Sequence, residues 1–375
     1  MKYNSEKVLD TLKMVKHPES GKSIVELGMV EDLEITDNKI KFSLVIKSSK
    51  DPFSKSLVKS CDRTLKFYLD ENIEVEVETK VQHFEAAAFK APARPFSGVK
   101  NIIGVASGKG GVGKSTVAAN LAISLAKTGA KVGLLDADIY GPSAPIMFDL
   151  VNAKPVATQE GGKTWIEPIE KYGIKIISIG FFVDPEKALI WRGSMATNAL
   201  NQFMNDGNWG KLDYVVIDMP PGTGDIHLTL VQAIGITGVV IVSTPQEVAL
   251  ADARKGVSMF QQKDINVPVL GLIENMAYFT PAELPNNKYY IFGKGGAKKL
   301  AAEMNVPLLA EIPLVQDIME AGEKGKPIAL NADDPMGKAF RKLAENVIIQ
   351  TEKRNKEMAP TTKVEMQEGA GCSTN

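Results

Sequence analysis

Cysteine and histidine are scarce in this chain of 375 residues. The 2 cysteines, Cys61 and Cys372, are too few for a disulfide framework and are typical of a reducing compartment. The 3 histidines, His17, His83 and His227, are scattered without the spacing of metal ligands. We therefore expect neither a disulfide framework nor a metal site built from histidine.

Long apolar runs and an excess of charge of one sign are also missing. No apolar run approaches the roughly 18 residues that cross a bilayer, and the first twenty or so residues lack the apolar core of a signal peptide. The 44 Lys and Arg residues balance the 45 Asp and Glu residues, so no basic surface typical of nucleic-acid binding is expected. These absences predict a cytoplasmic protein with neither a membrane nor a nucleic acid as partner.

Patterning divides the chain into two domains, a linker and a tail. Residues 1–85 predict a small α+β domain, in which helices near 6–16 and 53–69 accompany the alternating strand-like runs "KIKFSLVIK" and "IEVEVETKV". The next segments are an Ala- and Pro-rich linker, a large α/β domain, and a polar, aperiodic tail predicted to be disordered, at residues 86–98, 99–353 and 354–375.

The large domain alternates apolar strand-like runs with helical stretches. The runs are "NIIGVAS", "KVGLLDAD", "IKIISIGF", "LDYVVIDMP", "GVVIVSTP" and "VPVLGLIENM". Helical spacing marks residues 117–127, closed by Gly129, and a last helix with apolar positions from Phe340 to Ile348. Near-continuous apolar strands separated by helices predict a doubly wound, mostly parallel sheet buried on both faces.

A phosphate-binding loop follows the first of these strands. The segment "GKGGVGKS" matches G-x-x-x-x-G-K-[ST] and opens the next helix, where free N–H groups and the helix dipole favour an anion. Lys114 is predicted to reach the β- and γ-phosphates, and the Ser115 hydroxyl to ligate Mg²⁺. The complete predicted ATP-binding segment comprises Gly108, Lys109, Gly110, Gly111, Val112, Gly113, Lys114, Ser115 and Thr116.

Three aspartates follow two later strands at the edge where open α/β sheets place ligands. Asp136 and Asp138 are two residues apart, so that in an extended segment both side chains point to the same side. Asp218 follows "YVVI" and precedes a Pro- and Gly-rich loop. We interpret Asp218 and Asp136 as carboxylates of the Mg²⁺ site and Asp138 as the group that orients an attacking water, which is the outline of an ATPase or GTPase.

The motif "GKGGVGKST" resembles the deviant phosphate loop of the MinD/ParA class of ATPases. The resemblance implies a homodimer in which Lys109 of one subunit reaches the nucleotide of the other, so that hydrolysis depends on dimerisation. The alternative is that Lys109 only borders the site of its own subunit.

More of the chain is similar to one branch of that class, the Mrp/ApbC iron-sulfur cluster carriers. The motifs are "DADIYGPSAP", "WRGSM", "DMPPGTGD", "STPQEVALADARKGVSMF", "LIENMAYF" and "YYIFGKGGAKKLA", within about residues 98–350. The resemblance implies that Asn275 recognises adenine and that Arg192 lies near a dimer interface, although "WRGSM" is equally typical of a packed surface loop. Around "HPESGKSIVELGMVEDLEI" the first domain resembles the small SufT-type domain of iron-sulfur assembly proteins.

The chain departs from that branch at the cysteines. A C-x-x-C pair commonly follows the "NMxYF" segment in that branch, whereas this sequence has Thr280, Pro281, Ala282 and Glu283 there. Four thiolates normally hold an iron-sulfur cluster. Cys372 is the candidate ligand, with a stray tail cysteine as the alternative, because Cys61 shares one helical stripe with leucines and is interpreted as a core thiol.

The sequence therefore predicts an ATP- and Mg²⁺-dependent ATPase that dimerises and carries iron-sulfur clusters to client apoproteins. Two alternatives stay open. One is a MinD- or ParA-like positioning ATPase, which co-sedimentation with liposomes or DNA would reveal. The other is a nucleotide-gated adaptor that binds clients but carries no cluster.

Overall fold

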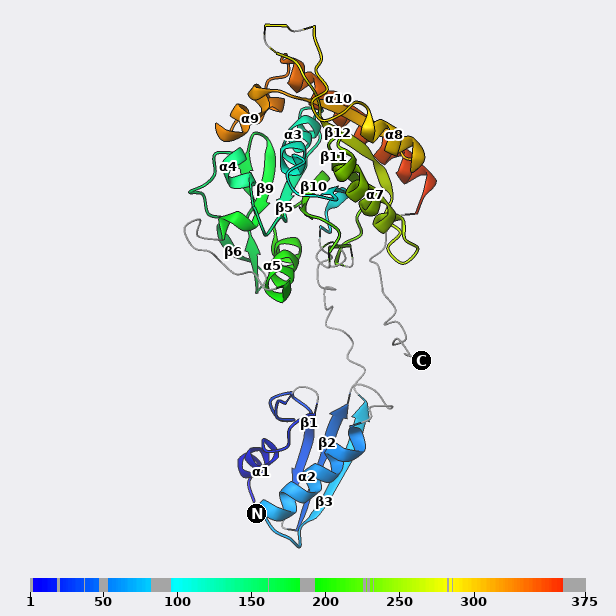
Figure 1. Ribbon diagram of the computed structural model, residues 1–375. Helices are drawn as coiled ribbons and strands as arrows, with labels where there is room; N and C mark the ends of the chain where they lie inside the picture. Colours follow the sequence, from blue (N-terminus) through cyan, green and yellow to red (C-terminus); the bar gives the residue numbers. More distant parts are fainter. Residues whose placement is uncertain are drawn as a thin grey trace, which may run out of the picture. The chain divides into compact units, whose positions relative to one another are not determined.

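The computed structural model describes residues 3–18, 21–36, 38–46, 53–81, 96–160, 162–182, 193–224, 227, 230–231, 233–281, 283–284 and 286–359. The chain forms two compact units, Met1–Pro92 and Ala93–Asn375. Each unit has its own sheet and its own helices (Figure 1). The linker predicted at 86–98 and the tail predicted at 354–375 fall largely outside the described residues.

The small unit is a three-stranded sheet with two helices. β1 (Val30–Ile35) runs antiparallel to β2 (Lys39–Ile46), which runs parallel to β3 (Glu74–Val81), and the helices are α1 (Ser5–Leu12) and α2 (Ser54–Tyr68). Apolar residues that alternate along β2 share one core with Leu57, Cys61 and Leu65 of α2. The intervening lysines of β2 form exposed ion pairs with glutamates of β3, so the opposite face of the sheet is charged.

Two details of the small unit differ from the sequence-based expectation. The first helix ends at Leu12 rather than near Lys16, which forms an isolated bridge with Ser23. Pro18 follows shortly after and cannot continue a helix. The strand β1 was not predicted, because its sequence "VEDLEI" has little apolar alternation.

The large unit contains the predicted doubly wound sheet, in the order β13-β12-β11-β4-β10-β5-β9-β8. The strands from β13 to β9 pair in parallel, whereas β8 at the edge runs antiparallel to β9. Their bounds are β4 (Val99–Ser107), β5 (Val132–Asp136), β8 (Ile169–Lys171), β9 (Ile174–Ser178), β10 (Leu212–Pro221), β11 (Gly238–Ser243), β12 (Val269–Phe279) and β13 (Leu308–Leu314). A separate hairpin pairs β6 (Ala157–Glu160) with β7 (Lys163–Ile166).

Helices cover both faces of this sheet (Figure 1). One hydrophobic cluster contains apolar residues of α3, α4 and α10, and another contains those of α5, α7 and α8; neighbouring strand residues such as Val215 and Val216 alternate between the two clusters. The helices are α3 (Lys114–Ala126), α4 (Ala144–Met147), α5 (Gly193–Asp206), α7 (Glu247–Gln261), α8 (Gly296–Glu303), α9 (Gln316–Glu323) and α10 (Pro335–Glu357), with short 3-10 turns η1 (Ile179–Phe181) and η2 (Ile328–Leu330). Strands buried on both faces explain the near-continuous apolar runs of the sequence.

Two boundaries in the large unit differ from expectation. Helix α3 begins at Lys114, three residues before the predicted start, because the end of the phosphate-binding loop already belongs to its first turn. Helix α10 continues to Glu357, beyond the predicted domain end at Lys353. Among the described helices, each is too short or too polar to cross a membrane.

Candidate functional site

The glycine-rich loop joins β4 to α3 and is shaped by close contacts as well as by backbone conformation. Gly111 and Gly113 have φ angles of 82° and 83°, a left-handed conformation that suits glycine. A Cβ atom at Gly108 would lie 2.2 Å from the backbone of Asp252 in α7, and one at Gly113 would lie 2.2 Å from Asn275 Nδ2. The loop therefore holds the N-terminus of α3, with its free N–H groups, against both α7 and β12.

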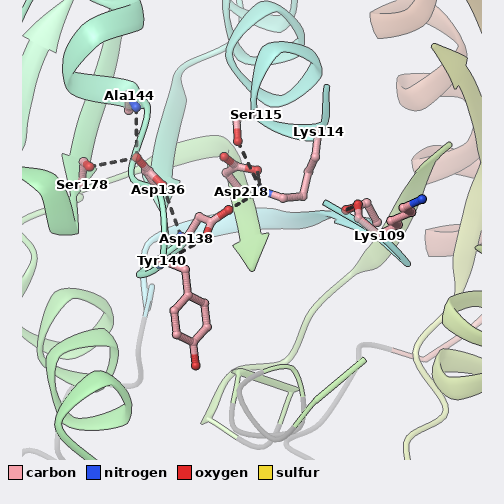
Figure 2. A network of polar contacts seen from close by, with 10 residues as sticks. Lys109, Lys114, Ser115, Asp136, Asp138, Tyr140, Ala144, Ser178 and Asp218 are labelled. Atoms are coloured by element: carbon pink, nitrogen blue, oxygen red, sulfur yellow. Dashed lines mark hydrogen bonds and ion pairs between the residues drawn. The ribbon is translucent and has the colours of Figure 1, made fainter. Parts of the chain in front are cut away.

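Lys114 is the centre of a buried ion-pair cluster. Its Nζ atom lies 2.5 Å from Asp218 Oδ1, 3.3 Å from Asp138 Oδ2 and 3.2 Å from Ser115 Oγ (Figure 2). The lysine is only 5% exposed. Burial lowers the pKa of Lys114, but the Asp218 and Asp138 carboxylates outweigh burial and raise it, so the ammonium stays charged.

Asp136 is held by three hydrogen bonds of its own. Its Oδ2 accepts from Ser178 Oγ at 2.9 Å and from the Ala144 N–H at 3.0 Å, and its Oδ1 accepts from the Asp138 N–H at 3.2 Å. Burial first, and then the Asp218 carboxylate, raise the pKa of Asp136 to about 7. Burial also raises the pKa of Asp218 despite its ion pair with Lys114. One ammonium among three buried carboxylates leaves excess negative charge, which a further cation would offset.

A small cavity lies between these side chains. It has a volume of about 10 Å³ and is lined by Ser115, Ala118, Ala119, Leu134, Asp136, Ser143, Ala144, Met147 and Asp218. Carboxylate and hydroxyl oxygens are the donors that Mg²⁺ prefers, and Mg²⁺ usually takes one or two carboxylates together with phosphates and water. In the described part of the chain no three His, Cys, Asp or Glu side chains form a metal cage by themselves. The residues thus fit Mg²⁺ that arrives with a nucleotide.

A larger cavity of about 420 Å³ also adjoins the loop. Thr116, Ser143, Asn275 and Glu323 contribute polar side chains to its lining, and β13 and α9 supply an apolar wall. The wall includes Pro313, Leu314, Val315, Ile318 and Met319. Its size and its mixture of an apolar wall with a few polar groups are typical of a small-molecule site.

Asn275 lies between the phosphate-binding loop and the larger cavity. Its Nδ2 donates to the Val112 carbonyl at 2.8 Å, and it also lines the larger cavity. The next residue, Met276, has a φ of 55°, which is unusual for a side chain of this size. Asn275 therefore supports the phosphate-binding loop directly, a role that the sequence did not predict.

Lys109 does not join the Lys114 cluster. Its side chain is exposed and points away from Lys114 and the aspartates, and no described residue forms an ion pair or hydrogen bond with its ammonium (Figure 2). Its carbonyl accepts a hydrogen bond from Ser107 Oγ at 2.9 Å. The ammonium is thus free to reach a group outside its own cluster.

The predicted cluster ligand Cys372 lies outside the described residues, as does Arg192, which was expected near a dimer interface. Cys61 is fully buried in the core of the small unit, where burial raises the pKa of its thiol to about 12, in agreement with its prediction as a core thiol. Glu283, one of the residues that stand in place of the absent C-x-x-C pair, is an exposed turn residue after β12.

Two parts of the site were missed in the sequence. Ser178, which holds Asp136, lies 42 residues away from it in sequence. The apolar wall comes from the segment "EIPLVQDIM", which forms the end of β13 and the start of α9. Nothing in the sequence of this segment indicates that it lines a binding site.

Comparison with known proteins finds a matching family for each of the two units. A family model described as "NUBPL iron-transfer P-loop NTPase" matches residues 98–348, and one described as "Iron-sulfur cluster assembly protein" matches residues 5–78. An iron-sulfur cluster carrier protein of Synechocystis is 45% identical over 343 residues, covering 91% of this chain and 96% of the relative. The carrier protein of Escherichia coli K12 is 41% identical over 345 residues, covering 92% and 91%.

A solved structure resembles the large unit. The nucleotide-binding protein from Archaeoglobus fulgidus, in complex with ADP, is 37% identical and superposes with a TM-score of 0.57, covering 67% of this chain and 96% of that one.

Proposed function

The chain belongs to the NUBPL-type family of iron-transfer P-loop NTPases, and from this premise we propose that it binds and hydrolyses ATP in order to carry iron-sulfur clusters to apoproteins. The observation that supports ATP binding and hydrolysis is the buried cluster of Lys114, Asp138 and Asp218 at the N-terminus of α3. The proposal that iron-sulfur clusters are carried rests on the relatives, which are named iron-sulfur cluster carrier proteins.

The phosphates of ATP would bind on the N–H groups of the glycine-rich loop and of α3. The Lys114 ammonium forms ion pairs with both Asp218 and Asp138. We infer that it turns to the β- and γ-phosphates when they arrive, since a phosphate chain carries more charge than either carboxylate. Ser115, Asp136 and Asp218 would then hold Mg²⁺, which offsets the charge of the phosphates.

The nucleoside would occupy the cavity of about 420 Å³ beside the loop. Its wall of Leu314, Val315 and Ile318 suits the flat apolar face of a base, and Asn275 offers an amide to its edge. The ADP bound by the Archaeoglobus fulgidus neighbour supports a nucleotide as ligand.

Hydrolysis requires that a water attacks the γ-phosphorus in line while the bond to the bridging oxygen of ADP breaks. We assign Asp138 to orient that water, because it lies beside Lys114 and its other oxygen accepts from the Tyr140 N–H at 3.3 Å. The products are ADP, inorganic phosphate and a proton. Lys109, exposed and turned away from its own cluster, is assigned to the nucleotide of a second copy in a homodimer, where it would stabilise charge that develops on the phosphates.

The iron-sulfur cluster would be cargo rather than a fixed cofactor. Cys61 is buried with a raised pKa, so it is a poor source of thiolate. Two copies of Cys372 supply two of the four thiolates that a cluster normally requires. We propose that outside thiols, from glutathione or from a client protein, complete the shell and that the cluster is bound weakly. A cytoplasmic location remains a prediction from the sequence.

A second candidate is an adaptor that binds clients under nucleotide control but carries no cluster. The observation that favours it is that Cys61, the one cysteine among the described residues, is buried. Anaerobic purification, followed by iron and sulfide analysis and an ATP turnover assay, separates the two. Iron and sulfide together with turnover support the carrier, turnover alone supports the adaptor, and no turnover contradicts both.

A further inference from the structure

Ser143 lies at the boundary between the two cavities of the site. It lines the small cavity together with Ser115 and Asp218, and it lines the larger cavity together with Gly113 and Thr116. The following helix, α4, also donates its Ala144 N–H to Asp136. The segment "DADIYGPSAP" therefore contacts the site twice, first through its two aspartates and then through Ser143. The Ser143 hydroxyl lies between the residues proposed to bind the metal and those proposed to bind the nucleoside.

The Ser143 hydroxyl has no partner in the described structure. Its Oγ atom is buried and forms no hydrogen bond. Ser143 occupies the N-cap position of α4, where serine commonly accepts from the helix backbone, yet its side chain makes no capping bond. The nearby Ser178 hydroxyl, by contrast, is bonded to Asp136 and to the Gly180 N–H. Because a buried polar group without a partner is costly, the Ser143 hydroxyl is available to a partner that enters one of the cavities.

We propose that Ser143 is a positioning residue that couples nucleotide affinity to Mg²⁺. Its hydroxyl would hold one ordered water where the two cavities meet, between the metal-binding side chains and the phosphate chain. A hydroxyl both donates and accepts, so it can fix the orientation of this water through either role. This inference rests on the proposed function, since it presupposes a nucleotide in the larger cavity.

The experiment compares ADP binding by the full chain in Mg²⁺ and in EDTA, using calorimetry, for wild type and Ser143→Ala. The Mg²⁺ enhancement of affinity should fall about two- to tenfold in the variant, the effect of one hydrogen bond, while affinity in EDTA stays unchanged. Ser143→Thr keeps the hydroxyl and should restore the enhancement. The matched control is Ser124→Ala, which removes the same atom from a buried serine of α3 that lines neither cavity.

The outcomes separate this inference from the proposed function. An unchanged Mg²⁺ enhancement in Ser143→Ala overturns the inference alone, and so does an equal loss of affinity in Mg²⁺ and EDTA, which indicates a merely structural role. A wild type that binds ADP equally well in both buffers also overturns it. A wild type that binds neither ADP nor ATP overturns the proposed function as well.

Discussion

Replacing Lys114 by methionine removes the one ammonium among the buried carboxylates and keeps most of the apolar stem. Nζ lies 2.5 Å from Asp218 and 3.3 Å from Asp138, in a side chain that is almost wholly buried. Removing one partner of a buried ion pair costs about 3–5 kcal/mol, because the other charge stays buried without compensation. We expect Lys114→Met to lower the free energy of unfolding of the large unit by about this amount at pH 8 without nucleotide.

The same loss should be smaller at pH 5.5. Burial already raises the pKa values of Asp136 and Asp218, and loss of the ammonium raises them further, so the carboxylates take up protons as the pH falls. One carboxyl that stays ionised in the wild type but takes up its proton in the variant over this range recovers up to about 3 kcal/mol, at 1.36 kcal/mol for each pH unit. The dependence on pH is the signature of electrostatic rather than packing damage.

Denaturant unfolding followed by tryptophan fluorescence measures this loss. All 3 tryptophans, Trp165, Trp191 and Trp209, belong to the unit Ala93–Asn375, so the signal reports on that unit. The matched control is Lys109→Met in the same loop, where an exposed lysine is replaced and a change within about 0.5 kcal/mol is expected. If Lys114→Met is as stable as this control at pH 8, or loses the same free energy at both pH values, the electrostatic reasoning is wrong.

Three further predictions follow from the site. Lys109→Ala should bind ATP but not hydrolyse it. An equal mixture of this variant with Asp138→Ala should regain about a quarter of the wild-type rate, because half of the dimers are mixed and each mixed dimer has one intact site. Heterodimers without activity would exclude the cross-subunit role. Because burial and Asp218 raise the pKa of Asp136 from 3.8 to about 7, its contribution to stability is present below pH 3.8 and is lost as the pH rises to about 7. Asp136→Asn should flatten this part of the pH profile of the free energy of unfolding, measured without nucleotide. An unchanged profile would contradict the raised pKa of Asp136. Cys372→Ser should remove reconstituted iron and sulfide and leave ATP turnover intact, whereas a stable stoichiometric cluster in that variant would refute the ligand assignment.

The sequence determined the sheet and the phosphate-binding loop because both depend on local chemistry. Apolar runs bury themselves on both faces wherever helices separate them, and Figure 1 shows that arrangement. Within the loop, glycine positions and the lysine act over a few consecutive bonds, so that their spacing alone fixes the backbone that they adopt. Strand β6 of the separate hairpin and strand β8 at the edge of the sheet are short and only partly apolar, which is why their sequences carried little signal.

Only the tertiary structure decided which groups meet across the sheet. Asp218 is 104 residues from Lys114 and Ala144 is 8 residues from the Asp136 that it bonds, and these separations have no period that a sequence pattern could reveal. Neither Ser143 nor the strand and helix that form the wall of the larger cavity carried a signal of a binding site in the sequence. Their roles arise because parallel strands end at one edge of the sheet, where loops that are distant in sequence lie side by side. The contacts among these loops determine which charged groups and hydroxyls are left without a partner.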